Sequence, residues 1–387
     1  MQSKCIYCNH DEFEPIFHRK NVPVRSNSPL KESEFSQNIL GTLDIVYCNQ
    51  CGIVFNREFN SNYLSIIYDE NYSSGLPLSQ NVLDKYHYIV DWIDENVPLK
   101  NKISIEVGAS DFTFSKLLLK KHVKKVIAID PSPVQTPPEK VELKKCYFPD
   151  DSLIKDVENA DIIFMRHILE HVPLPIDTIQ FLKSIKENAF LYVEVPRLEN
   201  ILNENKYYDF IYEHVSYFSS AFLHRLFQEN GFKIINETMI NDSQHVGMLV
   251  SRTLNQQPSS YDHTLNFNPA LFHQRIDEDL SGLASIINDP GKTAIYGAGN
   301  HAIYTAAYLN LNPNTIVCLF DINPKKQGYY SPGTLIPITT PTVDKINKLD
   351  TIIIMAALHQ NEIYTQIRND YSFKGDIYGL YPKFSKL

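Results

Sequence analysis

The clearest pattern of apolar and polar positions along the chain lies in residues 102–131. Ile103, Ile105 and Val107 form an apolar strand pattern that ends at Gly108, and a short turn separates it from a segment with apolar residues at helical spacing. A second apolar run, residues 126–129, ends in Asp130. This order of strand, glycine turn, helix and strand predicts a βαβ unit, with a ligand site at the carboxyl ends of its strands.

Later apolar runs predict the rest of the same sheet. The expected strands are residues 160–165, 190–196, 234–239 and 247–251. The expected helices are residues 81–96 and 221–230. Ser219 or Ser220 is a suitable N-cap for the second helix, and Gly231 is a suitable stop. The last two strands are expected to pair antiparallel and close the sheet.

A second unit of the same kind begins near residue 292. Its first strand leads into Gly297-Ala298-Gly299, and an apolar run at residues 315–320 ends in Asp321. The expected neighbouring elements are a polar linker at 255–260, a helix at 269–288 and a buried strand at 350–355. The chain therefore contains two Rossmann-like units in series, and its fold class is α/β.

Four cysteines mark the segment before the first unit. Cys5 and Cys8 form one Cys-x-x-Cys pair, and Cys48 and Cys51 form another, with short apolar runs on both sides of the second pair. Two such pairs complete a tetrahedral zinc site, which with four protein ligands is structural. The alternative is four unrelated thiols. A length of 387 residues predicts two or three domains. We expect a zinc-binding domain at 1–75 and two Rossmann-like domains at 76–253 and 254–387.

The composition limits the kinds of partner that the protein is expected to bind. The net charge is −9 and no long basic run is present, which argues against nucleic acid. No apolar run is long enough to span a membrane, and the N-terminus has no apolar signal segment. We therefore expect a cytoplasmic protein that acts on a small molecule, as a monomer or homodimer. In that compartment the six cysteines are expected in metal or core roles.

The turn after the first strand is not a dinucleotide fingerprint, because Ser110 and Thr113 stand where that motif needs glycines. Glu106-Val107-Gly108 is instead typical of class I S-adenosylmethionine (SAM) methyltransferases. Asp130 is placed to bind two ribose hydroxyls. The alternative is an ordinary βαβ unit without a cofactor. Phe148 is expected to lie against an adenine ring or to belong to the core.

Polar residues gather where later strands end. Residues 166–172, Arg-His-Ile-Leu-Glu-His-Val, follow a buried strand and point to the same crevice. Glu213, His214 and Tyr217 lie on the loop that leads into a helix. Histidine titrates near neutral pH, a carboxylate can orient it, and a tyrosine can donate to an oxyanion. These residues are candidates for acid–base work, and the alternative is an aromatic core loop.

The turn at Gly297 resembles a dinucleotide site, with Asp321 about twenty residues on. The same geometry accommodates the diphosphate of a sugar nucleotide. Lys325 and Lys326 follow in a turn-rich segment and add two positive charges. Both interpretations stay open from these residues alone.

The order of these parts resembles the sugar C-methyltransferase family, over essentially the whole chain. The resemblance is carried by Arg166-His-Ile-Leu-Glu-His171, Tyr212-Glu-His-Val-Ser-Tyr-Phe218 and Gly328-Tyr-Tyr-Ser-Pro-Gly-Thr-Leu-Ile-Pro-Ile338. The family methylates deoxysugar nucleotides, typically at C-3′ of a dTDP-4-keto sugar. The resemblance implies SAM as cofactor, a structural Zn²⁺, a class I SAM domain and a C-terminal domain that binds the sugar nucleotide.

The resemblance also implies roles for individual residues. His214 would be the base that forms an enolate, Glu213 would hold the sugar or the imidazole, and Tyr212 or Tyr72 would polarise the oxyanion. The residues expected at the cofactor are Glu106, Gly108, Ser110, Asp130, Phe148, Arg166 and His167. Those expected at the substrate are His171, Gly297, Gly299, Asn300, His301 and Lys326.

Two departures from the family pattern are visible. Tyr212 directly precedes Glu213, where the family commonly has a residue between them, and residues 356–362 lack an expected tryptophan–asparagine pair. Three other functions are weighed against a C-methyltransferase. They are a SAM-dependent O- or N-methyltransferase, an NAD-dependent oxidoreductase that uses Gly297, and a non-catalytic zinc-containing binding module.

Overall fold

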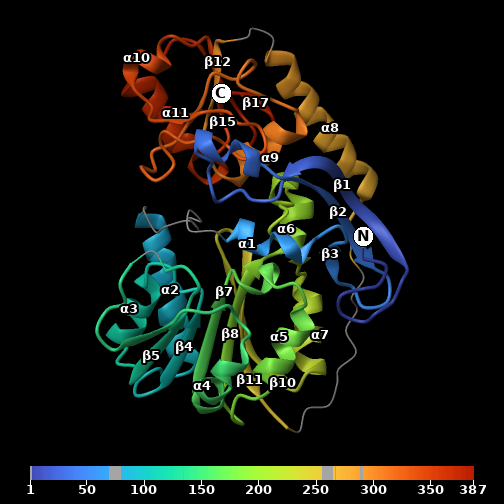
Figure 1. Cartoon of the computed structure of the whole chain (residues 1–387), viewed down its shortest axis with the longest axis vertical. Coiled ribbons are helices and arrows are strands. Elements are labelled where there is room, and N and C mark those ends of the chain that lie inside the picture. Colours follow the sequence, from blue (N-terminus) through green and yellow to red (C-terminus); the bar gives the residue numbers. More distant parts are fainter. Residues whose placement is uncertain (1, 69–79, 134, 255–264, 266, 288–290) are drawn as a thin grey trace.

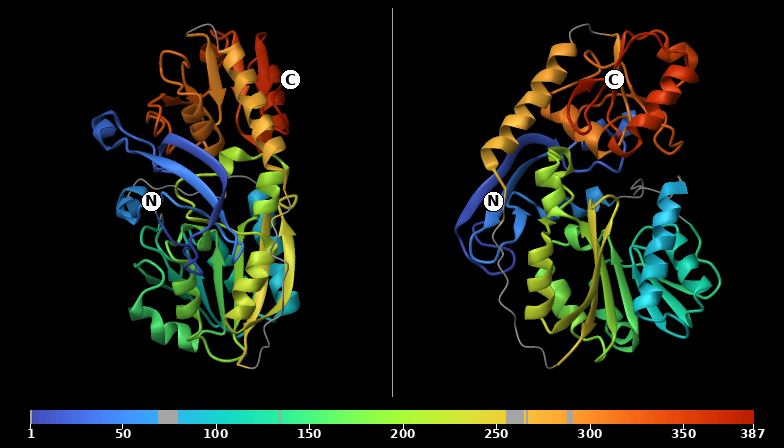
Figure 2. Two further views of the ribbon diagram at one scale, coloured as in Figure 1. Left: turned by 90° about the vertical axis from the view of Figure 1, so that its right-hand side faces the viewer. Right: turned by 180° about the vertical axis from the view of Figure 1, so that it is seen from behind.

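The computed structural model describes residues 2–68, 80–133, 135–254, 265, 267–287 and 291–387. This part of the chain forms a central seven-stranded sheet, a four-stranded N-terminal sheet and a six-stranded C-terminal sheet (Figure 1). In the views of Figure 1 and Figure 2, the blue N-terminal strands lie between the central sheet and the C-terminal unit.

The central sheet has the strand order β10-β11-β8-β7-β4-β5-β6. The strands are β4 (Ile103–Val107), β5 (Lys125–Ile129), β6 (Val141–Lys144), β7 (Ile162–Arg166), β8 (Phe190–Pro196), β10 (Phe232–Ile240) and β11 (His245–Arg252). Strand β11 pairs antiparallel with both β8 and β10, and the remaining neighbours pair parallel. The expected strands are thus confirmed, each within two residues of its predicted ends. Strand β6 was not predicted.

Helices cover both faces of this sheet. They are α2 (Gln80–Asn96), α3 (Thr113–Lys120), α4 (Ile154–Asn159), α5 (Pro175–Leu182), α6 (Leu198–Asn203) and α7 (Ser220–Glu229). Residues that alternate along β5 enter different cores: Val126 and Ala128 pack with α2 and α3, whereas Ile127 and Ile129 pack in the core that contains α5 and α7. The side chain of Ser219 accepts a hydrogen bond from the backbone N–H of Phe222 at 3.0 Å, which confirms the predicted N-cap of α7.

The N-terminal sheet contains a strand from a distant part of the chain. Its order is β1 (Phe13–Pro23), β2 (Leu40–Cys48), β3 (Val54–Asn56) and β9 (Ser216–Tyr217). Helix α1 (Leu64–Ile67) follows β3. The loop that carries His214 therefore leads directly into β9, which is hydrogen-bonded to the sheet of the cysteine-containing segment.

The C-terminal sheet has the order β14-β13-β12-β15-β16-β17. Its elements are α8 (Pro269–Ile286), β12 (Thr293–Tyr296), α9 (Asn300–Tyr308), β13 (Leu319–Phe320), β14 (Ile338–Thr339), α10 (Val343–Ile346), β15 (Thr351–Ile354), α11 (Gln360–Asn369), β16 (Asp376–Gly379) and β17 (Ser385–Lys386). The prediction of a strand at 315–320 was too long. The backbone N–H groups of Thr315 and Ile316 both donate to the carbonyl of Asn312, so the start of that run is a turn.

We keep the three-domain division as a proposal, because both expected limits fall within or beside residues 69–79 and 255–264, outside the described part. Short 3₁₀ helices connect the larger elements at Glu32–Gln37, Ser61–Tyr63, Asp151–Leu153, Leu169–His171, Tyr207–Asp209 and Ala357–His359. Among the described residues, none of the helices has the length and apolar character needed to cross a bilayer.

Candidate active site

A cavity of about 830 Å³ lies at the carboxyl ends of the central strands. Its volume is in the usual range for a small-molecule site. It brings together most of the residues predicted at the site: Glu106, Gly108, Ser110, Asp130, Phe148, Arg166, His167, His171, His214, Gly299, Asn300 and Lys326. The two Rossmann-like units therefore contribute to a single cavity.

The conformation of the turn after β4 depends on the positive φ of Gly108 and on hydrogen bonds to Asp130. Gly108 has φ +77°, and a Cβ at this position would collide with the side chain of Ile168. One carboxylate oxygen of Asp130 accepts the backbone N–H of Ser110 and the other accepts that of Ser132, each at 2.8 Å. The carboxylate thus fixes the turn while it lines the cavity, where ribose hydroxyls can reach its remaining lone pairs.

Two other residues predicted at the cofactor have mixed surroundings. Glu106 is buried and accepts a hydrogen bond from the Ser115 hydroxyl, and burial raises the pKa of its carboxyl to about 8. Phe148 lines the cavity and also packs edge-on against Phe181, with ring centroids 5.4 Å apart. Phe148 therefore lies between the cavity and the core, and its contact with an adenine ring stays a prediction.

Arg166 and His167 share a carboxylate that was not among the predicted site residues. The Nε of Arg166 donates to Glu194 at 2.7 Å, and the Nε2 of His167 lies 3.3 Å from the same carboxylate. Burial alone would lower the pKa of His167, but its bonds to Glu170 and Glu194 raise it to about 9. Burial and this neighbouring imidazole lower the pKa of His245 to about 3.

His171 and His214 form an imidazole pair on the cavity wall. Their ring centroids are 4.8 Å apart, and the Nδ1 of His171 lies 3.0 Å from the carbonyl oxygen of Glu213. This contact requires a proton on Nδ1 of His171. Burial, assisted by the neighbouring imidazole of His171, holds the pKa of His214 well below its usual value. His214 is therefore neutral at physiological pH and is available as a proton acceptor.

Glu213 faces the N-terminal unit rather than the cavity. Its carboxylate accepts the hydroxyl and backbone N–H of Ser26 and, at 3.0 Å, the side-chain amide of Asn27. It is buried and is not among the residues that line the cavity. The expected contact of this carboxylate with the sugar or an imidazole is thus replaced by contacts with residues 26–27. Glu213 contacts the imidazole pair through its backbone carbonyl, which orients His171.

Tyr212 is likewise committed elsewhere. Its hydroxyl donates to the carbonyl of Glu58 at 3.2 Å and accepts the backbone N–H of Asn60 at 3.1 Å. Tyr212 does not line the cavity, and the hydrogen bonds of its hydroxyl all go to the backbone of residues 58 and 60. Tyr217 bonds through its hydroxyl to the backbone of Ile211. Tyr72 lies outside the described residues.

The loop that carries His214 is held by both neighbouring units. The hydroxyl of Tyr304, on α9, accepts the backbone N–H of Tyr212 at 2.7 Å and donates to the carbonyl of Pro23 at 3.0 Å. Tyr308 donates to the carbonyl of Phe210 at 3.0 Å. Together with the bonds of Glu213 to residues 26–27, these bonds make the position of the loop depend on the N-terminal and C-terminal units as well as on the central sheet.

The C-terminal unit contributes the start of α9 and the half-buried side chain of Lys326 to the cavity. Gly299, Asn300 and Lys326 line it, and the Nζ of Lys326 donates to the carbonyl of Ala298 at 2.7 Å. Burial lowers the pKa of Lys326. The Oδ1 of Asn300 is buried with no partner in the described part of the chain.

Gly297 and His301, in contrast, are not among the lining residues. The ring of His301 stacks on Tyr208 with centroids 3.6 Å apart, and burial lowers the pKa of His301 to about 3. Gly297 has φ +108°, so its glycine is explained by the turn itself. Neither residue is therefore exposed to the cavity, and a contact of either with substrate stays a prediction.

The four cysteines of the N-terminal segment come together as expected. Their sulfur atoms lie within 4.8 Å of one another, with Cys5 to Cys51 at 3.6 Å and Cys8 to Cys48 at 3.5 Å. A zinc tetrahedron with bonds of about 2.3 Å has edges of about 3.8 Å, so this set fits Zn²⁺ with little movement. All four positions would be filled by protein, which makes a structural role the natural one.

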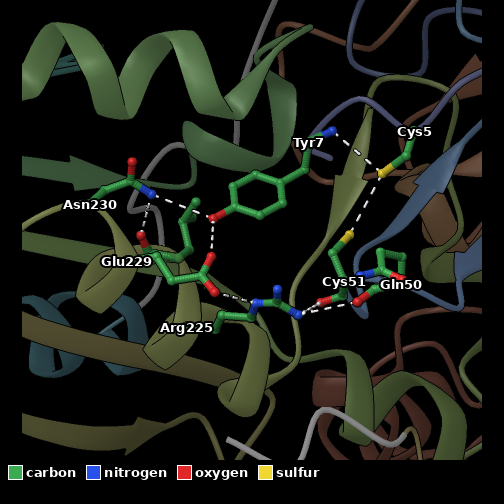
Figure 3. A network of polar contacts seen from close by, with 8 residues as sticks. Cys5, Tyr7, Gln50, Cys51, Arg225, Glu229 and Asn230 are labelled. Atoms are coloured by element: carbon green, nitrogen blue, oxygen red, sulfur yellow. Dashed lines mark hydrogen bonds and ion pairs between the residues drawn. The ribbon is translucent and has the colours of Figure 1, made fainter. Parts of the chain in front are cut away.

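The cysteine cluster is tied to α7 by polar contacts (Figure 3). Arg225 donates to the carbonyl of Cys51 at 3.2 Å and to Glu229 at 2.8 Å. The hydroxyl of Tyr7 donates to the same Glu229 at 2.8 Å. A metal bound at the cysteines would therefore support the packing of the N-terminal segment against the central unit.

Comparison with known families agrees with this site. Residues 83–237 match the family model of a methyltransferase domain, and residues 237–378 match that of a C-methyltransferase C-terminal domain. The central sheet, its glycine turn and the first match define the chain as a SAM-dependent methyltransferase of class I fold. The second match identifies it more closely, as a SAM-dependent C-methyltransferase.

One curated relative and several solved structures are similar to this chain. The chain is 21% identical to the C-methyltransferase NovU of Streptomyces niveus, in an alignment that covers 93% of this chain and 91% of NovU. Similar solved structures include a SAM-dependent methyltransferase from Archaeoglobus fulgidus, with 11% identity, a TM-score of 0.34 and 43% of this chain and 94% of that chain covered. The CurJ carbon methyltransferase has 12% identity and a TM-score of 0.36, with 45% of this chain and 56% of that chain covered.

Proposed function

We propose that this C-methyltransferase acts on a nucleotide-linked keto-deoxysugar and methylates a carbon next to the ketone through an enolate. The observation that carries the proposal is the position of the His214 imidazole, which lines the same cavity as the Gly108 turn. Burial lowers the pKa of this imidazole, which favours its base form. A carbon acceptor needs a base, because the carbon must lose a proton before it can attack. The adjacent ketone makes this loss possible by taking the negative charge onto its oxygen.

The cofactor half of the cavity fits SAM. Asp130 offers a carboxylate for ribose hydroxyls, Phe148 offers an aromatic surface for the adenine, and the backbone at Gly108 is open to close approach. When bound, SAM supplies an electrophilic methyl group. Asp130, Phe148 and the backbone at Gly108 would bind and orient SAM.

The nucleotide half is proposed to lie against the C-terminal unit. The nine-residue helix α9 begins at Asn300, and the exposed N–H groups of such a terminus favour an anion. The amine of Lys326 lines the same part of the cavity and adds a positive charge. Both features suit a diphosphate, and the partnerless Oδ1 of Asn300 provides an acceptor for a sugar hydroxyl.

In the proposed reaction His214 takes the proton from the carbon beside the ketone. The low pKa of His214 keeps its imidazole in the base form even at mildly acidic pH. His171 lies beside it, with its tautomer set by the Glu213 carbonyl.

The test is hydrogen exchange at the acceptor carbon in D₂O, with a dTDP-4-keto-6-deoxyhexose and S-adenosylhomocysteine in place of SAM. Wild-type protein should exchange the proton next to the ketone, and His214→Ala should slow this exchange by at least about 100-fold, the usual contribution of a general base. His87→Ala, at an exposed position on α2, is the matched control and should exchange at the wild-type rate. Equal exchange by His214→Ala and wild type would remove the assigned base. An O- or N-methyltransferase would show no exchange at carbon.

A further inference from the structure

Glu170 is a buried carboxylate beside the imidazole pair, and the reaction described above leaves it without a role. It lies in the 3₁₀ turn Leu169–His171 and is 1% exposed. Its Oε1 is 3.3 Å from the Nδ1 of His167. Its Oε2 is buried and has no partner within the described part of the chain. A buried carboxylate oxygen without a donor is costly, so a use for this atom is expected.

The unpartnered oxygen is matched by an unpartnered nitrogen. The Nδ1 of His214 is also buried without a partner among the described residues. One carboxylate oxygen of Glu170 and one ring nitrogen each of His171 and His214 lie within 4.8 Å of one another. A shift of about 1–2 Å would bring a carboxylate oxygen and an N–H from this distance into hydrogen-bond range, and catalytic hydrogen bonds often tighten in this way when substrate binds.

Two hydrogen bonds to backbone carbonyls fix the position of Glu170 relative to the loop that carries His214. The N–H of Val215 donates to the carbonyl of Glu170 at 2.7 Å, and the Nδ1 of His171 bonds to the carbonyl of Glu213. These two bonds lie on either side of His214 in the sequence. His167, itself fixed by Glu194, holds the other carboxylate oxygen of Glu170. The carboxylate therefore cannot easily turn away from the pair.

We propose that Glu170 is a positioning residue that accepts the Nδ1–H of His214 and so leaves Nε2 of His214 as the proton acceptor. The proposal rests on the proposed function and adds to it the group that sets the tautomer of the base. When the C–H bond of the keto sugar breaks, its electron pair stays on the sugar as the enolate. The proton forms an N–H bond at Nε2 of His214. The negative charge of Glu170 then faces the imidazolium that has formed.

The experiment compares Glu170→Gln with wild type in the deuterium exchange assay. Glutamine keeps the size of the side chain but removes the negative charge, so the exchange rate should fall about 100-fold while the Kd of SAM and the KM of the sugar nucleotide change less than twofold. Glu187→Gln, at an exposed position, is the control and should behave as wild type. In Glu170→Ala, added formate should restore part of the exchange rate, because formate returns a carboxylate to the vacated space. A merely structural role would not produce this rescue.

Several results would overturn the proposal. Wild-type exchange rates in Glu170→Gln would do so, as would a loss of SAM binding in parallel with exchange, which would indicate a general structural defect. Metal analysis supplies another such result. One zinc per chain is expected from the cysteines, and a further ion that disappears in Glu170→Gln would make the Glu170, His171 and His214 cluster a metal site instead. If wild-type protein itself fails to exchange the keto sugar, the proposed function fails, and this outcome is distinct from a failure of the Glu170 variant alone.

Discussion

The two Rossmann-like units are built alike around their glycine turns. In the central unit Asp130, at the end of β5, accepts the backbone N–H of Ser110 in the turn. In the C-terminal unit Asp321, after β13, accepts the backbone N–H of Ala298 at 3.1 Å in the corresponding turn. Each aspartate also bonds to the N–H two residues further on. The local framework is therefore the same in both units.

The difference lies in what surrounds each turn. Strand β7, next to β4, ends in Arg166 and is followed by His167, and both face the cavity. Strand β15, next to β12, is followed by Met355 and Ala356, whose atoms pack against Gly297. The comparison shows that a shared strand, glycine and aspartate do not by themselves define a cofactor site. Residues after the neighbouring strand pack against the glycine in both turns, but Gly108 lines the cavity and Gly297 does not.

The largest expected effect separates the two glycines. Gly108→Ala places a methyl group at positive φ and against Ile168, so the turn that lines the cavity must shift, and the Kd of SAM should rise about 100-fold. Gly297→Ala has the same kind of backbone strain at φ +108° but should leave the Kd of SAM within twofold. Isothermal titration with SAM measures both.

Titration of the same two variants with NADH sharpens the comparison. Gly297→Ala should not change the binding of NADH, because atoms of Met355 and Ala356 already pack against Gly297. Tight NADH binding that depends on Gly297, without binding of SAM, would reverse the assignment of the two turns.

A smaller effect is expected from the aspartates. Asp130→Asn keeps the size of the side chain but weakens its hydrogen bonds to ribose hydroxyls, and should raise the Kd of SAM about tenfold, the usual cost of losing a charged hydrogen bond. Asp321→Asn is the matched control and should leave this Kd unchanged. An equal loss in both variants would mean that both act only through the fold, which circular dichroism melts would reveal.

The smallest effect concerns the charged strand end of the central unit. Bonds to Glu170 and Glu194 raise the pKa of His167 to about 9, so its stabilising contribution is complete below about pH 6.5 and is lost as the pH rises through about 9. Solvent reaches 36% of this side chain, which limits the contribution to about 1 kcal/mol. Urea unfolding of wild type and His167→Gln should therefore differ at pH 6 and converge at pH 10.

His359, which follows β15 in the C-terminal unit, provides the control for this pH effect. It forms an exposed pair with Glu362, so His359→Gln should track wild type at both pH values. A difference between wild type and His167→Gln that stayed constant up to pH 10 would contradict the proposed ionic contribution of His167.

Much of the framework was predictable because it depends on local patterns. The run of residues 103–107, the glycine and the acid at Asp130 specify a strand, a turn and a second strand by spacing alone. The two Cys-x-x-Cys pairs likewise predicted the cluster that the structure forms. Such features depend on residues close in sequence, or on residue types with few alternative uses.

The contacts that orient the site were not predictable in the same way. Glu194 meets Arg166 because the two residues are opposite each other in the parallel register of β7 and β8, which the sequence does not specify. The occurrence of charge at both strand ends was the available signal. Glu213 is bound by Ser26, 187 residues away, and no local pattern points to this contact. Short strands such as β9 form only because the N-terminal sheet receives them.

The most direct test of the account is the position of the transferred methyl group. We suggest incubating the protein with SAM labelled with ¹³C in its methyl group and a dTDP-4-keto-6-deoxyhexose labelled with ¹³C in its ring, followed by NMR of the product. The account predicts a methyl resonance split by direct coupling to the ring carbon next to the ketone. A methyl group attached to oxygen, without this one-bond coupling, would contradict it.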